Sequence, residues 1–268
     1  MNQSLLTLKS TTTIVLLLFS VLLAYAQHEF ITTWDTTKSG SSNSTSIRIP
    51  TFDLGYNYDV DWNNDGTFDE SGITGDVTHD FGVSGTYTIR IQGSFPRIYF
   101  NNQQDKLKIL SVDQWGTNPW TSMENAFVGA ENLIVTATDS PNLSNLISLK
   151  YMFGKCISFN SDINAWDTAT VINMEYMFYQ ASSFNQNIGL WNVSNVTSFT
   201  DMLLGAGLSS TNYDALLIGW DAQNLSPNES FHGGDSQYCS IAAQNARQHM
   251  IDSDGWAIED GGFCDGIK

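Results

Sequence analysis

Short runs of alternating hydrophobic and polar residues dominate the first third of the chain after position 27. The clearest runs cover residues 46–49, 56–62 and 85–91, and Gly, Asn and Asp fill the segments between them. A period of two places successive side chains on opposite faces of a β-strand. We therefore expect an antiparallel β-sandwich over residues 27–100.

The middle of the chain repeats its hydrophobic pattern every 25 or 26 residues. The predicted repeat core consists of Phe127, Phe153, Trp166, Phe178, Trp191 and Leu203. Within one unit, Val171, Met174, Met177 and Ala181 have the spacing of a helix, and the run over 184–191 alternates like a strand. Each unit is therefore predicted to contain one helix and one strand.

Such a unit cannot bury both of its apolar faces alone, whereas stacked copies can. The sequence thus predicts a short leucine-rich-repeat-type solenoid of about four units over residues 101–208. Asn160 and Asn185 each follow a core Phe at a turn, and we expect them to hydrogen-bond the backbone between units. Cys156 occupies a column that holds Ala in the other units, which favours a small buried residue.

The segment 209–268 contains two helical patterns. Tyr213, Leu216, Leu217 and Trp220 recur at helix spacing, and a second helix is expected from about 240 to 251. Because an open end of a solenoid exposes apolar core, these helices are predicted to form a C-terminal cap. The expected fold class is therefore mixed β and α/β.

Residues 1–26 resemble an export signal. The apolar run from Ile14 to Leu23 is followed by Ala24-Tyr25-Ala26, a typical cleavage site. Removal of Lys9 with this segment leaves 10 basic and 28 acidic residues, a net charge of −18. We expect a secreted or cell-surface protein without a membrane span, and its acidity excludes nucleic acid as a favoured partner.

Export to an oxidising compartment favours disulfide bonds. Cys239 and Cys264 bracket the last predicted helix and strand, and we expect them to be paired. Cys156 then remains free.

No complete catalytic motif is visible in the sequence. Gly234-Asp235-Ser236 superficially resembles a hydrolase serine block, and its candidate partner His249 lies on the last predicted helix. The segment is more simply a turn, so we expect no enzyme and no organic cofactor.

A calcium loop is one of two interpretations of residues 61–72. Asp61, Asn63, Asp65, Thr67 and Asp69 fall at alternate positions of such a loop, with Gly66 at its turn. Position 12, normally a bidentate Glu, is Gly72. The alternative is a metal-free hairpin turn rich in Asn and Asp.

Two family resemblances rest on quoted motifs. Val60-Asp61-Trp62-Asn63-Asn64-Asp65-Gly66, with Gly85-Thr86-Tyr87-Thr88, resembles the PKD-like β-sandwich signature. Asn173-Met174-Glu175-Tyr176-Met177-Phe178 and Trp191-Asn192-Val193-Ser194-Asn195-Val196 resemble the repeat of BspA-like leucine-rich-repeat surface proteins. That resemblance implies an exported, surface-associated protein with a role in adhesion. Because no complete catalytic motif is present, we expect a non-catalytic protein that binds an extracellular protein or glycan partner.

Two other functions stay open at the level of sequence. The chain could be a carbohydrate-binding accessory module, with exposed aromatic rings stacked on sugars, or a structural spacer in a larger surface assembly. Trp34, Trp62 and Trp120 lie outside the repeat phase, and are the candidates for exposed rings.

Overall fold

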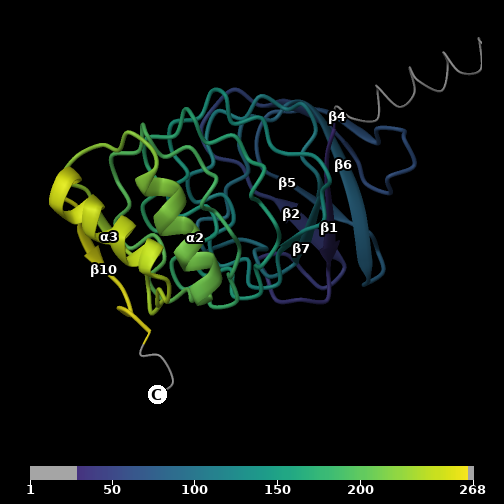
Figure 1. Ribbon diagram of the computed structural model, residues 1–268. Helices are drawn as coiled ribbons and strands as arrows, with labels where there is room; N and C mark the ends of the chain where they lie inside the picture. The colour runs from purple at the N-terminus through teal and green to yellow at the C-terminus, as the bar shows by residue number, and fades with distance from the viewer. Residues whose placement is uncertain (1–28, 265–268) are drawn as a thin grey trace, which may run out of the picture.

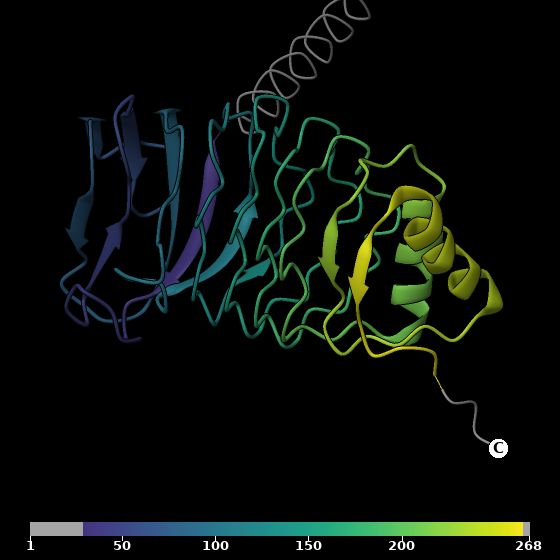
Figure 2. The ribbon, with the colours of Figure 1, turned by 90° about the vertical axis from the view of Figure 1, so that its left-hand side faces the viewer.

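The computed structural model describes residues 29–264, so the predicted export signal lies outside the described residues. Most strands gather at one end of the molecule and the two labelled helices at the other (Figure 1). The repeat units form a row of irregular turns between these ends (Figure 2).

The main sheet has six strands in the order β4-β3-β6-β1-β7-β8. Its members are β1 (Phe30–Asp35), β3 (Asn57–Asp61), β4 (Glu70–Ile73), β6 (Thr86–Ser94), β7 (Ile109–Gln114) and β8 (Ile134–Val135). Neighbours pair antiparallel except β7 and β8, which are parallel. A separate antiparallel pair joins β2 (Ser46–Ile49) to β5 (Val77–Asp80).

The predicted fold class is wrong. Strands are present in the three expected runs, as β2, β3 and β6. They do not close a separate sandwich, because β1 pairs with β7, and β7 continues the sheet into the first repeat unit through β8. The hydrophobic pattern changes near residue 100 from a period of two to a repeat of 25 or 26 residues, and this change predicts two independent regions. The strand pairing instead continues across that point.

The repeat units contain no helix among the described residues, which overturns the helix-plus-strand solenoid. Hydrogen bonds within a unit connect residues three apart, as from Met177 N to Met174 O at 3.2 Å and from Ala181 N to Phe178 O at 3.0 Å. These turns give apolar residues a helix-like spacing. They cannot propagate as a helix, because Tyr176 and Gln180 both have φ of 56°, in the left-handed region.

Backbone hydrogen bonds join each unit to the next. Tyr176 N donates to Thr200 O at 2.9 Å, Phe178 N to Met202 O at 2.9 Å, and Gln180 N to Leu204 O at 2.8 Å. The same pattern links the preceding unit, where Tyr151 N donates to Glu175 O at 3.0 Å and Phe153 N to Met177 O at 2.9 Å. The amides that a helix would bond internally therefore bond the neighbouring unit instead.

The last segment contains α2 (Ser210–Asp221), β9 (Ser230–His232), α3 (Ile241–Asp254) and β10 (Ala257–Glu259). Both predicted helices are present, and Ser209 and Ser240 cap them by accepting backbone N–H bonds. They do not make the predicted helical cap. Strands continue the stack, because Phe199 bridges to Phe231 in β9, and β9 pairs in parallel with β10.

Helix α2 lies close against the preceding unit. A Cβ atom on Gly219 would collide with the carbonyl group of Gly189, so only glycine permits this approach. Trp220 on α2 donates its indole N–H to Ile188 O at 3.1 Å, and Trp191 donates to Ile163 O at 3.0 Å. Trp220 therefore takes, in the helix, the place that Trp191 has in the repeat.

Candidate functional site

The predicted repeat core forms the interior of the stack. Phe127, Phe153 and Phe178 are fully buried, and their rings stack at centroid distances of 5.8 and 5.9 Å. Leu203 and Trp191 are also buried. Because these side chains fill the interior, they cannot contact a partner directly, and the binding surface has to come from other positions of the unit.

A row of tyrosines lies on the outside of the same units. Tyr151 and Tyr176 stack at 4.5 Å with an interplanar angle of 4°, and Tyr179 meets Tyr176 edge-on at 5.8 Å. All three are partly exposed. Tyr151 and Tyr176 both have φ of 56°. At these positions the side chains face outwards, while the residues that follow each tyrosine are buried.

An ion pair flanks the tyrosines. Lys150 Nζ pairs with a carboxylate oxygen of Glu175 and lies 5.9 Å from the ring centre of Tyr176. The hydrogen bond and charge of Glu175 raise the pKa of Lys150, and those of Lys150 lower the pKa of Glu175. Burial raises the pKa of Tyr151. We call Lys150, Tyr151, Glu175, Tyr176 and Tyr179 the tyrosine face.

The predicted calcium loop makes many bonds of its own. Asp61 is buried, and its carboxylate accepts from Gly66 N at 2.8 Å and from Asp65 N at 3.2 Å. Asp65 accepts from Thr67 N at 2.8 Å, and Asp69 from Trp62 N at 2.8 Å. The turn is thus satisfied by backbone amides, which suits the metal-free alternative.

The charge around this loop also bears on calcium. Arg90 Nε lies 3.9 Å from a carboxylate oxygen of Asp61, and the same guanidinium donates to Asn64 Oδ1 at 2.9 Å. A nearby cation opposes binding of Ca²⁺ at Asp61. Calcium at this loop stays a prediction.

The predicted disulfide between Cys239 and Cys264 is confirmed, with the two Cα atoms 5.1 Å apart. Cys156 is free and buried. Burial raises the pKa of its thiol, which keeps it protonated and unreactive. Cys156 is therefore a packing residue of the stack.

The serine block does not form a catalytic group. Ser236 is buried, and its Oγ accepts a hydrogen bond from Leu208 N at 3.1 Å. His249 pairs with Asp221 on α2 instead. His232 Nδ1 accepts from Gly234 N at 3.0 Å, which closes the predicted turn.

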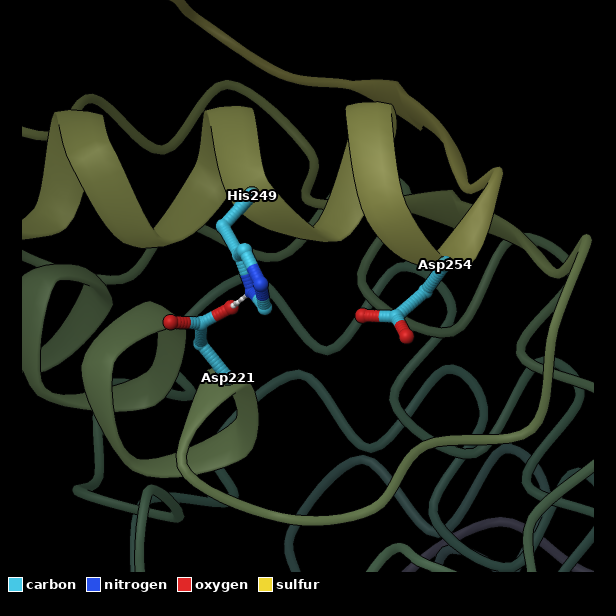
Figure 3. A group of neighbouring side chains, drawn as sticks. All are labelled: Asp221, His249 and Asp254. Carbon is cyan, nitrogen blue, oxygen red and sulfur yellow. Dashed lines mark hydrogen bonds and ion pairs between the residues drawn. The ribbon is translucent and has the colours of Figure 1, made fainter.

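Asp221, His249 and Asp254 are the side chains that lie closest to a metal-binding arrangement in the described chain (Figure 3). His249 Nδ1 is 2.7 Å from Asp221, and the side chain of His249 is 58% exposed. The hydrogen bond and charge of Asp221 raise the pKa of His249. When protonated, His249 forms an ion pair with Asp221, and this pair accounts for the proximity of the two side chains without a metal.

The tryptophans expected to be exposed are buried. Trp34 and Trp120 have no exposed surface and Trp62 has 3%. Trp62 stacks on His79 at 4.4 Å, inside the N-terminal strands. Sugar stacking on an open tryptophan face is therefore not available at these positions.

The asparagine prediction agrees with the structure. Asn160 Oδ1 accepts from Asn185 N at 2.8 Å, and Asn185 Oδ1 accepts from Ser209 N at 2.8 Å. Sequence reasoning missed the tyrosine face, although Tyr151 and Tyr176 are 25 residues apart and share the repeat phase.

Within residues 29–264, no helix has the length and apolar character needed to cross a bilayer. No curated protein and no solved structure matches the chain. Residues 96–221 match the family model described as a Mycoplasma protein of unknown function, DUF285. The matched segment contains the tyrosine face and ends with helix α2.

Proposed function

We propose that this chain is an exported, non-catalytic protein that binds an extracellular protein partner through the tyrosine face. The observation that carries the proposal is the stacked, partly exposed Tyr151–Tyr176 pair with Tyr179 beside it. Tyrosine is enriched in protein interfaces, because it offers a large apolar ring and a polar tip at a low entropic cost. All eight tryptophans are buried, so none of them offers a partner an exposed aromatic ring, whereas the tyrosine face does.

The surroundings of the tyrosine face also suit a protein partner. The same two units expose Ile147 and Ile172 at 63% and 40%. Backbone bonds between units hold the tyrosines in place, so binding orders little of the surface. The net charge of −18 that remains without residues 1–26 favours a basic or neutral partner over an acidic one. The DUF285 match names no partner, and it does not conflict with this proposal.

The experiment is a binding screen of residues 27–268 against purified extracellular-matrix proteins, measured by biolayer interferometry. The variant Tyr151→Asn/Tyr176→Asn removes both stacked rings. Asn suits these positions, because Asn125 has φ of 57° at the equivalent place in the preceding unit. Leu190→Asn, at a site that is 79% exposed, is the matched control.

We expect at least one matrix protein to bind the wild-type chain and the Leu190→Asn control alike. The double variant should lose about tenfold or more in affinity, since tyrosines that a partner covers at an interface are common hot spots. Equal binding by the double variant would contradict the proposal, and so would turnover of an ester, peptide or glycoside by the purified chain that is lost in Ser236→Ala.

A further inference from the structure

The loop that follows β7, residues 115–120, borders two adjoining pockets. One has a volume of about 300 Å³ and is lined by Asp139 among others. The second has about 230 Å³ and is lined by Phe95 and Asn118. Thr117 lines both, so the two hollows meet at a single exposed residue.

Asn118 gives the second pocket an unused hydrogen-bond acceptor. Its side-chain nitrogen donates to Phe95 O at 2.5 Å, while Oδ1 has no partner among the described residues. Asn118 is only 7% exposed. A buried polar atom without a partner costs about 1–3 kcal/mol, so a group that donates an N–H or O–H bond is favoured in this pocket.

The loop is held rigidly by its neighbours. Its first and last residues, Trp115 and Trp120, are fully buried, with ring centroids 6.1 Å apart, and Trp120 meets Phe30 edge-on at 4.9 Å. The Asp139 carboxylate accepts from Trp115 N at 3.1 Å and from Gly116 N at 2.8 Å. These contacts preorganise both pockets, which lowers the cost of binding a ligand.

The lining chemistry selects the ligand. Asp113 and Asp139 supply carboxylate acceptors in the first pocket, and the residues described around both hollows include no Lys, Arg or His. An anion is therefore disfavoured. The exposed ring of Pro119 adds apolar surface to the second pocket, whose lining also includes the buried Phe95. A neutral molecule with several hydroxyl donors and an apolar C–H face meets all of these conditions.

We propose that the two pockets around Thr117 form a binding site for a neutral sugar unit of a glycan. Their volumes lie near the lower end of the roughly 300–1,000 Å³ typical of small-molecule sites, which suits one or two sugar rings. The site lies apart from the tyrosine face in sequence and takes a different class of ligand, so it extends the proposed function.

The test uses residues 27–268 and the methyl glycosides of glucose, galactose, mannose and N-acetylglucosamine. Amide shifts of the ¹⁵N-labelled chain are followed by NMR during titration. We expect at least one glycoside to bind with a Kd in the millimolar range, on the order of 1–10 mM. The shifts should cluster in the parts of the chain that line the two pockets, which are residue 30 and the segments 91–95, 113–118 and 138–140.

Thr117→Trp places a large ring between the two pockets at an exposed position, and Ser182→Trp is the matched control on an exposed turn of a later unit. Thr117→Trp should weaken binding about tenfold or more, and Ser182→Trp should leave it unchanged. Thermal melting of both variants checks that they are folded.

Three results would overturn the proposal. One is the absence of binding by all four glycosides at roughly 50 mM, well above the expected Kd. Another is a set of shifts that maps outside the two pockets or persists in Thr117→Trp. The third is binding of arginine methyl ester but of no glycoside, which would assign the site to a cationic side chain.

Discussion

Replacement of Phe178 by Ala tests how the stack is held together. Phe178 is fully buried and touches rings on both sides: it stacks on Phe184 at 3.8 Å within its unit and on Phe153 at 5.9 Å in the unit before. Trp191 lies 6.2 Å away. The truncation removes a whole ring from this group and leaves a cavity that the rigid neighbours cannot fill.

Large-to-small changes of this kind cost about 3–5 kcal/mol, and the aromatic pairs contribute about 0.5–1.5 kcal/mol each within that range. We expect Phe178→Ala to lower the free energy of unfolding by that amount in urea titrations followed by circular dichroism. Tyr179→Ala, at the adjacent but partly exposed residue, should cost less than about 1 kcal/mol.

The slope of the free energy against urea should be the same for both variants and wild type, so that the midpoints compare stability alone. A loss below about 1 kcal/mol for Phe178→Ala would refute the packed column. A loss of equal size for Tyr179→Ala would show that the repeat fails to distinguish inner from outer positions.

Three further predictions concern single groups. Reduction of the Cys239–Cys264 disulfide, whose two cysteines are 25 residues apart, should lower the free energy of unfolding by about 3 kcal/mol in chemical unfolding. The buried thiol of Cys156 should resist thiol reagents at pH 8 until the chain unfolds. A calcium site at residues 61–69 predicts that millimolar calcium raises the melting temperature of wild type but not of Asp65→Ala; unchanged melting of wild type would leave only the metal-free turn. The pKa of His249 should lie above 6.5 in an NMR titration and fall towards that value in Asp221→Asn. Because the folded pKa is raised, the stabilising ion pair is fully present below pH 6.5 and is lost as the pH rises through the folded pKa; a pKa at or below 6.5 would contradict the pairing.

The repeat phase was readable from the sequence, because buried columns require the same residue class at a fixed step. The repeat phase correctly predicted that Phe153 and Phe178 are buried. It also correctly predicted that the turn asparagines hydrogen-bond the backbone between units. Periodic burial, however, does not specify the backbone that produces it. Apolar residues three apart fit both a helix and a series of turns.

The signal that separates these two backbones was present but small. Gly129 and Gly205 occupy the column that holds Lys155 and Gln180 in the two units between them. All four have positive φ, from 56° to 77°. Glycine in two copies of one column indicates a left-handed position, which a continuous helix does not tolerate.

Other features could not be predicted because they depend on pairing between distant segments. Strand β7 lies beside β1, about 80 residues earlier in the chain, as the bond from Thr33 Oγ1 to Asp113 shows. Trp120 packs against Phe30 of β1 and is fully buried, although its position in the sequence predicted an exposed ring. The tyrosine face could not be predicted either, because the outward direction of Tyr151 and Tyr176 depends on their left-handed backbone conformation.

Oxidative footprinting of tyrosines, compared between the free chain and its complex with the best-binding matrix protein, tests the central claim most directly. Tyr151, Tyr176 and Tyr179 should be oxidised in the free chain and protected in the complex. Tyr99, which is partly exposed and packs beside Arg97 among the N-terminal strands, should be oxidised equally in both. Unchanged oxidation of the three tyrosines in a saturated complex would contradict binding through the tyrosine face.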